Sequence, residues 1–238
     1  MGNGIDWAGK TLAAIRISVA GVILAALVSQ LVFTWRIYAG VPRYLIKYFS
    51  FFTVQSNLMA AGMLLLAAWY GFRRMNGPAQ FAVLRCAVTA YMVVTSVVYH
   101  MPFNVITLDQ PVTVTWANTM LHLIAPAYLV FDFLFAPGRS VVRWNRFWII
   151  MTYPVGWIIY TMVRAPLVDW YPYPFLNPRF SVEGNLSVAG YLAVIALFIA
   201  LVDIVMIGLS RLPLPWRVRS NVRVVRTVGV PSDIRYGG

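Results

Sequence analysis

Residues 187–209 read SVAGYLAVIALFIALVDIVMIGL, a stretch in which Asp203 is the only charged side chain. A helix needs about 17–25 mainly apolar residues to cross the hydrocarbon core of a bilayer, and this stretch is long enough. Similar apolar stretches precede it at about 11–35, 49–72, 80–102, 115–136 and 146–163. Because backbone groups in lipid must hydrogen-bond within their own segment, these six stretches predict an all-α bundle of six transmembrane helices.

The composition agrees with a membrane protein and excludes an ordinary soluble domain. Of the 238 residues, 61% are hydrophobic and only 11% are charged. We expect one membrane domain over residues 1–210 and a basic tail over residues 211–238. The first stretch is too long for a signal peptide and no small-residue cleavage site follows it, so we expect it to be retained. Cys86 is the only cysteine and has no partner for an intrachain disulfide.

The net charge of +12 is unevenly distributed along the chain. One set of helix ends and the tail hold Lys10, Arg73, Arg74, Arg139, Arg143, Arg146, Arg211, Arg217, Arg219, Arg223, Arg226 and Arg235. The opposite loops hold Arg36, Arg43, Lys47, Arg164 and Arg179, offset by Asp109, Asp169 and Glu183. The positive-inside rule then places both termini in the cytoplasm. We expect the tail to contact anionic lipid headgroups rather than nucleic acid.

Four charged residues lie inside the apolar stretches, about one to two turns from the cytoplasmic face. They are Arg16, Arg85, Asp132 and Asp203. An unpaired charge at this depth costs ~2.5–3.5 kcal/mol on insertion scales. We therefore expect structural Arg–Asp pairs, with ion or proton conduction as the alternative, and the partner of each charge stays open.

Polar side chains gather near the outer ends of the second and fourth stretches. Thr53, Ser56 and Asn57 stand at i, i+3 and i+4 and share one helix face. At 1.5 Å per residue, Thr53 is expected about 6 Å below the start of its stretch and His122 about 10 Å below the start of its own. Asn118 lies four residues before His122 on the same face. Two helices thus bring hydroxyl groups and an imidazole to similar depth, which predicts the functional site.

This combination suits nucleophilic catalysis. A threonine hydroxyl becomes a nucleophile when a base such as neutral imidazole removes its proton. Ser56, Asn57 and Asn118 would orient the imidazole or donate hydrogen bonds to an oxyanion. An apolar cavity at this depth favours lipid substrates, whereas a hydrogen-bonded polar core without catalysis is the simpler alternative.

Prolines mark two further features. Pro126 lacks the N–H that would bond the carbonyl of His122, so we expect a kink and a carbonyl that needs another partner. In the long loop over residues 164–186, the run from Trp170 to Pro178 contains three prolines among aromatic residues. Such a loop is typical of an anchor at the membrane interface. The functional alternative is a rigid lid over an outward-facing cavity.

Two other classes of function stay open. His100 ends the third stretch on the outer side, so His100 and His122 could ligate one haem. The chain could instead be a non-catalytic lipid-binding or assembly subunit. The sequence shows neither a glycine-rich phosphate loop nor a cysteine-rich metal motif. If the protein is a hydrolase, we expect it to use no cofactor and no metal. The oligomeric state stays open.

Two motifs resemble a known group of proteins. Phe51-Phe52-Thr53-Val54-Gln55-Ser56-Asn57 and Tyr171-Pro172-Tyr173-Pro174-Phe175-Leu176-Asn177-Pro178 are similar to signatures of the bacterial proline-rich six-transmembrane family. That group resembles the androgen-induced family of integral membrane threonine hydrolases, which split fatty acid esters of hydroxy fatty acids. The resemblance covers roughly residues 10–210.

The resemblance implies roles for particular residues. Thr53 would be the nucleophile and His122 the base of a membrane-embedded lipid ester hydrolase, in a bacterial plasma membrane. Ser56 and Asn57, with Gln55, match only the bacterial signature. Asn118 and His100 are further candidates for binding or orienting the lipid substrate.

The charge distribution makes the topology testable. A single cysteine placed in the loop 164–186 of a Cys86→Ala background should react with an impermeant maleimide added to intact cells. A cysteine in the tail should react only after the cells are opened. The reverse pattern would contradict cytoplasmic termini and the outward-facing cavity together.

Overall fold

The computed structural model describes residues 3–38, 40–75, 77–101, 113–137, 140–180 and 184–212, and these residues form helices and connecting turns without a β-strand. This confirms the predicted all-α class. The long helices are α1 (Asn3–Ile37), α3 (Phe52–Phe72), α4 (Ala79–His100), α7 (Phe147–Val168) and α8 (Asn185–Leu209). The shorter helices are α2 (Arg43–Ser50), α5 (Thr115–Thr119), the π-helix η2 (Met120–Ile124) and α6 (Ala125–Phe135). Single 3₁₀ turns are η3 (Trp144–Arg146), η4 (Pro174–Leu176) and η5 (Pro178–Phe180).

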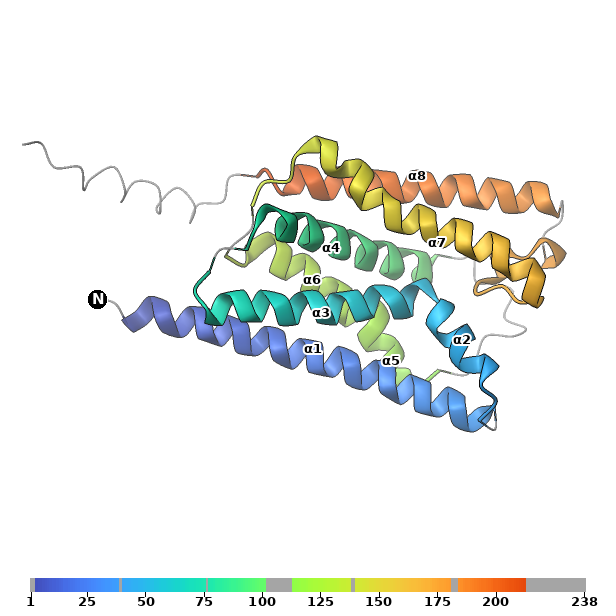
Figure 1. Cartoon of the computed structure of the whole chain (residues 1–238), viewed down its shortest axis with the longest axis horizontal. Helices are drawn as coiled ribbons and strands as arrows, with labels where there is room; N and C mark the ends of the chain where they lie inside the picture. Colours follow the sequence, from blue (N-terminus) through green and yellow to red (C-terminus); the bar gives the residue numbers. More distant parts are fainter. Residues whose placement is uncertain are drawn as a thin grey trace, which may run out of the picture.

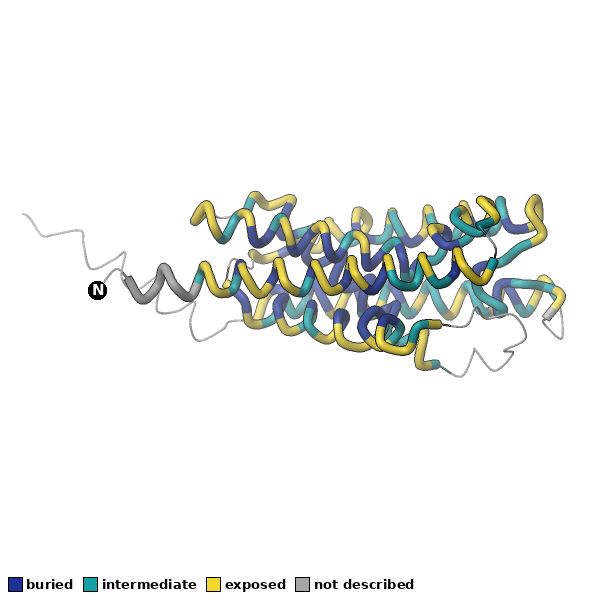
Figure 2. Tube along the Cα trace, turned by 90° about the horizontal axis from the view of Figure 1, so that it is seen from below, coloured by how far each residue is buried: buried dark blue, intermediate teal, exposed yellow. Residues whose placement is uncertain are grey.

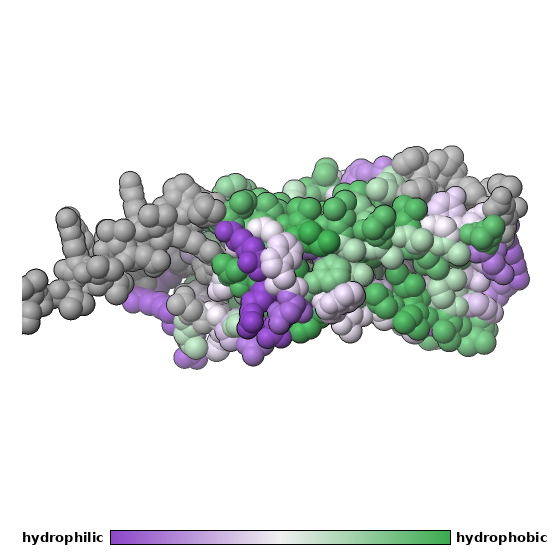
Figure 3. Space-filling view, turned by 90° about the horizontal axis from the view of Figure 1, so that it is seen from above, coloured by the Kyte–Doolittle hydropathy of each residue, from purple (hydrophilic) through white to green (hydrophobic). Residues whose placement is uncertain are grey.

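Five spans in the described chain are long and apolar enough to cross a membrane. They are Gly9–Ile37, Phe52–Phe72, Ala79–His100, Thr115–Phe135 and Asn185–Leu209. On the face drawn in Figure 3, hydrophobic residues cover most of the length between hydrophilic groups toward the ends. These features are consistent with an integral membrane protein. Helix α7 is not among these five spans, and it contains Arg164, Pro154 and Pro166 together with tryptophans and tyrosines.

Helix α4 lies in the middle of the bundle, between α7 and α8 on one side and α3 and α6 on the other (Figure 1). Buried positions follow the inner sides of the helices, and exposed positions follow the outer sides (Figure 2). Most of α4 is buried, and small residues such as Ala82, Ala87 and Ala90 let its neighbours approach closely. Exposed apolar side chains on the outer helices then form the surface that lipid would contact.

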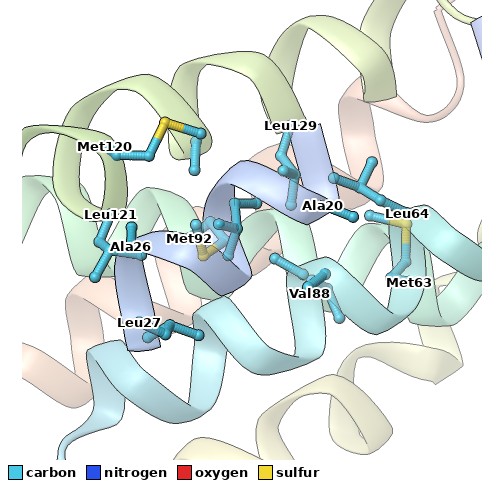
Figure 4. Packing of buried hydrophobic residues seen from close by; sticks show 14 of the residues in the cluster. Ala20, Ala26, Leu27, Met63, Leu64, Val88, Met92, Met120, Leu121 and Leu129 are labelled. Atoms are coloured by element: carbon cyan, nitrogen blue, oxygen red, sulfur yellow. The ribbon is translucent and has the colours of Figure 1, made fainter. Parts of the chain in front are cut away.

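One hydrophobic cluster joins α1, α3, α4 and the segment from α5 to α6. Figure 4 shows Ala20, Leu64, Val88 and Leu129 converging from four of these helices. All four are fully buried. A second cluster joins α4 to α7 and α8 around residues such as Phe133 of α6. Helix α4 contributes to both clusters, so it connects the two halves of the bundle.

Two predicted boundaries are wrong. The stretch 49–72 is not one helix, because Phe51 adopts an extended conformation with φ −69° and ψ 132° and separates α2 from α3. Thr53 is therefore the second residue of α3 rather than about one turn inside it. Helix α7 continues to Val168, so Arg164 lies within this helix and the following loop begins at Asp169.

The buried charges form one network rather than two pairs. The carboxylate of Asp132 accepts hydrogen bonds from Arg16, with Nε at 2.8 Å from Oδ1 and Nη2 at 3.2 Å from Oδ2. Arg85 Nη2 lies 3.0 Å from Oδ2 of the same carboxylate. Arg16 Nη1 also donates to the carbonyl of Ala67 at 3.4 Å. The network thus joins α1, α3, α4 and α6.

The expected pairing of Asp203 with an arginine is wrong. Both of its carboxylate oxygens are buried without a hydrogen-bond partner within the described chain. Asp132 takes both guanidinium groups because it lies between the helices that carry them, whereas α8 lies on the far side of α4 (Figure 1).

Several charges counted in the sequence lie outside the described residues. These are Asp109, Arg139, Glu183 and the tail residues Arg217, Arg219, Arg223, Arg226 and Arg235. The predicted contact of the tail with lipid headgroups lies outside them as well.

The two buried aspartates should respond differently to neutralisation. Asp132→Asn removes the carboxylate charge that two buried guanidinium groups share, and breaking such a buried pair costs ~3–5 kcal/mol. We expect a large fall in the melting temperature of the detergent-purified protein. Asp203→Asn is the matched control, because this residue has no ion pair with any of the described residues. Equal losses in the two variants would contradict the structural role of the network.

Candidate functional site

A partly open cavity of about 490 Å³ lies toward α2 and the loop after α7. This end of the bundle is the one that the charge distribution predicts to face outward, and it is called the outer end, with the opposite end called the inner end. Its walls come from α1, α2, α3, α4, α7, α8, the segment α5–η2 and the loop after α7. The volume falls in the range typical of ligand pockets, and apolar side chains provide most of the wall. Thr53, His122 and Asn118 all face this cavity. The structure therefore brings the two predicted catalytic residues to one space.

The break between α2 and α3 positions Thr53. Three side-chain hydrogen bonds hold this break: Trp157 Nε1 to the carbonyl of Ser50 at 3.1 Å, Gln55 Nε2 to that of Phe49 at 2.7 Å, and Tyr48 Oη to that of Leu27 at 2.8 Å. Because α3 begins at Phe52, the Thr53 hydroxyl lies at the outer end of the helix and lines the cavity.

The Thr53 hydroxyl faces the phenol of Tyr173. Their oxygens are 3.5 Å apart, and either group can donate. Burial raises the pKa of Tyr173, so the phenol stays protonated and able to donate a hydrogen bond. Sequence reasoning placed Tyr173 in the proline-rich motif but missed it as a site residue, since no local pattern connects it to Thr53.

Ser56 and Asn57 support α3 rather than line the cavity. Both side chains are fully buried and donate to the carbonyl of Thr53, at 3.1 and 2.9 Å. The Ser56 hydroxyl also lies 3.0 Å from that of Thr95 on α4. Asn57 Nδ2 reaches across to the carbonyl of Leu121 at 3.3 Å. The residues predicted to contact an oxyanion thus hold Thr53 and its helix in place.

His122 lies within the π-helical turn η2, between α5 and α6. Its Nδ1 is 3.0 Å from the carbonyl of Asn118. A carbonyl can only accept, so Nδ1 carries the proton and Nε2 of the neutral ring is the acceptor. The Tyr99 ring stacks on the imidazole with centroids 3.9 Å apart, and the Asn118 amide donates to the Tyr99 hydroxyl. Asn118 therefore orients His122 directly and through Tyr99, a residue that sequence reasoning missed.

The π-helical turn is the structural response to Pro126. Ala125 donates its N–H to the carbonyl of Met120, five residues back, and Pro126 has no N–H to donate. The carbonyl of Leu121 therefore accepts from neither Ala125 nor Pro126. The side-chain amide of Asn57 donates a hydrogen bond to it instead. The sequence predicted a freed carbonyl at His122, and the carbonyl for which the structure shows a replacement donor is that of Leu121. The outer end of α3 is thereby attached to the turn that carries His122.

The proline-rich loop covers the cavity. Residues 169–177 contribute to its wall, and Phe175 and Leu176 are buried. Tyr173 stacks on Phe175 with centroids 5.4 Å apart and packs edge-on against Phe51 at 5.8 Å. The second contact attaches the loop to the break between α2 and α3, which supports the interpretation of a rigid lid.

His100 lies apart from the predicted site. Its side chain is exposed, and Nδ1 is 2.7 Å from the carbonyl of Ser96. The Tyr99 ring contacts both imidazoles, edge-on to His100 at 5.0 Å and stacked on His122. A haem ligated by both histidines would require Tyr99 to move. In the described residues, no three His, Cys, Asp or Glu side chains lie together as metal ligands would.

Comparison of the chain with protein-family models, with curated proteins and with solved structures finds no match. The family resemblance described above therefore rests on the two short motifs, and the functional argument rests on the geometry of the cavity.

The Asn57 side chain should stabilise the protein by replacing the backbone donor that Pro126 lacks. Asn57→Ala leaves the buried carbonyl of Leu121 without a donor, which costs ~1–3 kcal/mol of stability. Pro126→Ala restores a backbone N–H, so the double variant should lose less stability than the sum of the single variants.

Ser56→Ala is the control for this cycle. Its hydroxyl bonds Thr53 and Thr95 and does not reach η2, so its effect should add to that of Pro126→Ala. Chemical denaturation in a mild detergent measures the three single and the two double variants. Additivity of Asn57→Ala with Pro126→Ala would contradict the proposed replacement of the donor.

Proposed function

We propose that the chain is a membrane-embedded lipid ester hydrolase with Thr53 as nucleophile and His122 as general base. The observation that carries the proposal is that both side chains line one largely apolar cavity covered by a loop. A hydroxyl, a neutral imidazole and a phenol then surround a space suited to an acyl chain. Fatty acid esters, the substrate class implied by the sequence resemblance, fit this combination.

We further propose that the bundle crosses a bacterial plasma membrane six times, with both termini in the cytoplasm. Helices α1, α4 and α7 run in one direction and α3, α5–α6 and α8 in the other (Figure 1). Helix α7 has 22 residues and is about 33 Å long at 1.5 Å per residue, enough to span the hydrocarbon. Its outer face is apolar, with Trp148 74% and Leu167 81% exposed. The basic residues Arg73, Arg74, Arg143, Arg146 and Arg211 follow or precede helix ends on the same side as the start of α1.

The proposed reaction has two stages. Nε2 of His122 takes the hydroxyl proton as Oγ1 of Thr53 attacks the ester carbonyl, and the Tyr173 phenol donates a hydrogen bond to the developing oxyanion. The tetrahedral intermediate collapses, and the alcohol leaves with the proton from His122. Water, activated by the same imidazole, then hydrolyses the acyl-threonine and restores the hydroxyl.

A non-catalytic lipid-binding protein is the second candidate. No hydrogen bond joins Thr53 to His122 in the described structure, and the Thr53 hydroxyl faces Tyr173 instead. Catalytic hydrogen bonds are often loose without substrate, so this geometry is compatible with both candidates. Activity of the purified protein separates them.

A covalent probe tests the chemistry. A lipid fluorophosphonate should label Thr53, because the proposed mechanism forms a covalent bond to Oγ1. Thr53→Ala should abolish labelling and ester hydrolysis with little change in melting temperature, and Thr53→Ser should retain part of both. His122→Ala should lower the rate by ~10²–10⁴-fold, as is typical for a general base.

A double variant and a control variant test the roles of Thr53 and His122 further. The losses in Thr53→Ala and His122→Ala should not add in the double variant, because the two residues act as one unit. Thr119→Ala is a matched control: this exposed hydroxyl lies near His122 in sequence and bonds the carbonyl of Thr115. Full hydrolysis in Thr53→Ala would rule out the proposed nucleophile and favour the binding protein.

A further inference from the structure

The cavity at the outer end has a polar side and an apolar side. Between positions 30 and 48, every residue of the described wall carries a polar group; these are Gln30, Thr34, Tyr38, Tyr44, Lys47 and Tyr48. Helices α7 and α8 contribute the opposite set, which is Pro154, Trp157, Ile158, Leu192, Ile195 and Ile199. The indole N–H of Trp157 is the one polar side-chain group of this second set, and it donates to the carbonyl of Ser50. Helices α1 and α2 lie on one side of α3, and α7 and α8 lie beyond α4 on the other (Figure 1).

The proposed nucleophile lies between these two sides. The phenol of Tyr173 lies 3.5 Å from the Thr53 hydroxyl, and its ring packs against that of Trp157 with centroids 5.9 Å apart. His122 lies in η2, which packs against α1. Gln30 of α1 accepts a hydrogen bond from the backbone just before α5, at 2.9 Å. The phenol therefore belongs to the apolar side and the imidazole to the polar side.

This arrangement gives a bound ester a direction. In the reaction proposed above, His122 gives its proton to the leaving alcohol, so the alcohol oxygen must lie on the side of the imidazole. The acyl chain then extends from the carbonyl away from His122, toward α7 and α8. A second long apolar chain on the alcohol would instead lie against polar groups, which it cannot satisfy.

The apolar side continues toward the inner end along one face of α8. Leu192, Ile195 and Ile199 stand at i, i+3 and i+7. Ile199 is buried and lies about 21 Å along α8 from Asn185 at 1.5 Å per residue. Of the wall residues on α8, it is the one nearest the inner end, and Pro154, which is also buried, has the same place on α7. These two residues form the inner boundary of the apolar side.

We propose that the site takes single-chain fatty acid esters of a small alcohol with further hydroxyl groups, such as glycerol. The acyl chain lies against α7 and α8, and Ile199 limits its length. Tyr38 and Tyr44 offer hydroxyl groups to the alcohol. The direction of the ester rests on the proposed function, but the fit of each end to its side of the cavity is a matter of binding. It is therefore measured in Thr53→Ala, which lacks the nucleophile and leaves the ester intact.

Binding of monoacylglycerols of increasing acyl length to detergent-purified Thr53→Ala tests the apolar side. Ile199→Trp in this background should raise the Kd of long-chain esters about tenfold or more and leave short-chain esters unchanged, because two displaced methylene groups account for a change of this size. Ile195→Trp, about one turn nearer the outer end, should exclude shorter chains as well. Leu197→Trp is the matched control, because Leu197 is 73% exposed on α8 and should not affect binding.

A second pair of ligands tests the polar side in the same background. Monododecanoylglycerol and propyl dodecanoate differ only in the hydroxyl groups of the alcohol. The rings of Tyr38 and Tyr44 stack with centroids 3.8 Å apart, and Tyr38→Phe/Tyr44→Phe keeps both rings while removing the hydroxyls. This double variant should raise the Kd of the glycerol ester about fivefold or more and leave that of the propyl ester unchanged. Tyr160→Phe is the control, since Tyr160 is exposed on α7 and is not part of the cavity wall.

Each Kd is compared with that of Thr53→Ala in the same detergent, so partition of the ester into micelles cancels. Melting temperatures identify any variant that fails to fold, and the remaining variants then carry the test. An unchanged dependence on chain length in the folded tryptophan variants would overturn the proposal. Equal effects of the tyrosine variant on the two esters, or no saturable binding of either ester, would overturn it as well.

Hydrolysis by the original chain reports separately on the proposed function. Selective binding in Thr53→Ala without hydrolysis by the original chain would contradict the hydrolase and support the assignment of the two sides. Hydrolysis by the original chain, with none of the expected effects on binding, would contradict the present proposal alone.

Discussion

The carboxylate of Asp132 is the interaction on which the rest of the bundle depends. It forms ion pairs with Arg16 and Arg85 from two other helices, and Arg16 extends the network to the backbone of α3. Inside an apolar bundle such charges are tolerated only when they are paired and hydrogen-bonded, so the network selects one arrangement of the helices. The apolar contacts of Ala20, Leu64 and Leu129 are less specific, because many packings would bury them.

A second constraint operates in the outer half of the bundle. Pro126 removes a backbone donor, the helix responds with a π-helical turn, and Asn57 satisfies the carbonyl that this turn leaves open. Asn57 also bonds the carbonyl of Thr53. One amide side chain therefore links the backbone of the proposed nucleophile to the turn that carries the proposed base. Such π-helical turns are frequently found at functional sites.

The inner and outer halves use polar groups differently. At the inner end, two arginines form direct ion pairs with one aspartate inside the bundle. At the outer end, hydroxyls, an imidazole and cations face a cavity that a proline-rich loop covers. This division separates the part of the molecule that maintains the helix arrangement from the part that is available to a ligand. The loop contributes Tyr173 and Trp170, so it supplies side chains to the cavity as well as covering it.

The sequence by itself determined the helical class and the approximate helix positions, because hydrophobic length depends on local composition. It also indicated that Pro126 would disturb a helix. Only the tertiary structure decided that both arginines pair with Asp132 and that Asp203 has no ion pair among the described residues, since depth along a helix does not specify which neighbour lies beside it. The break at Phe51, the placement of Tyr173 beside Thr53 and the stacking of Tyr99 on His122 likewise depend on how distant segments pack. Such contacts have no local sequence signal, because they exist only after the helices have met.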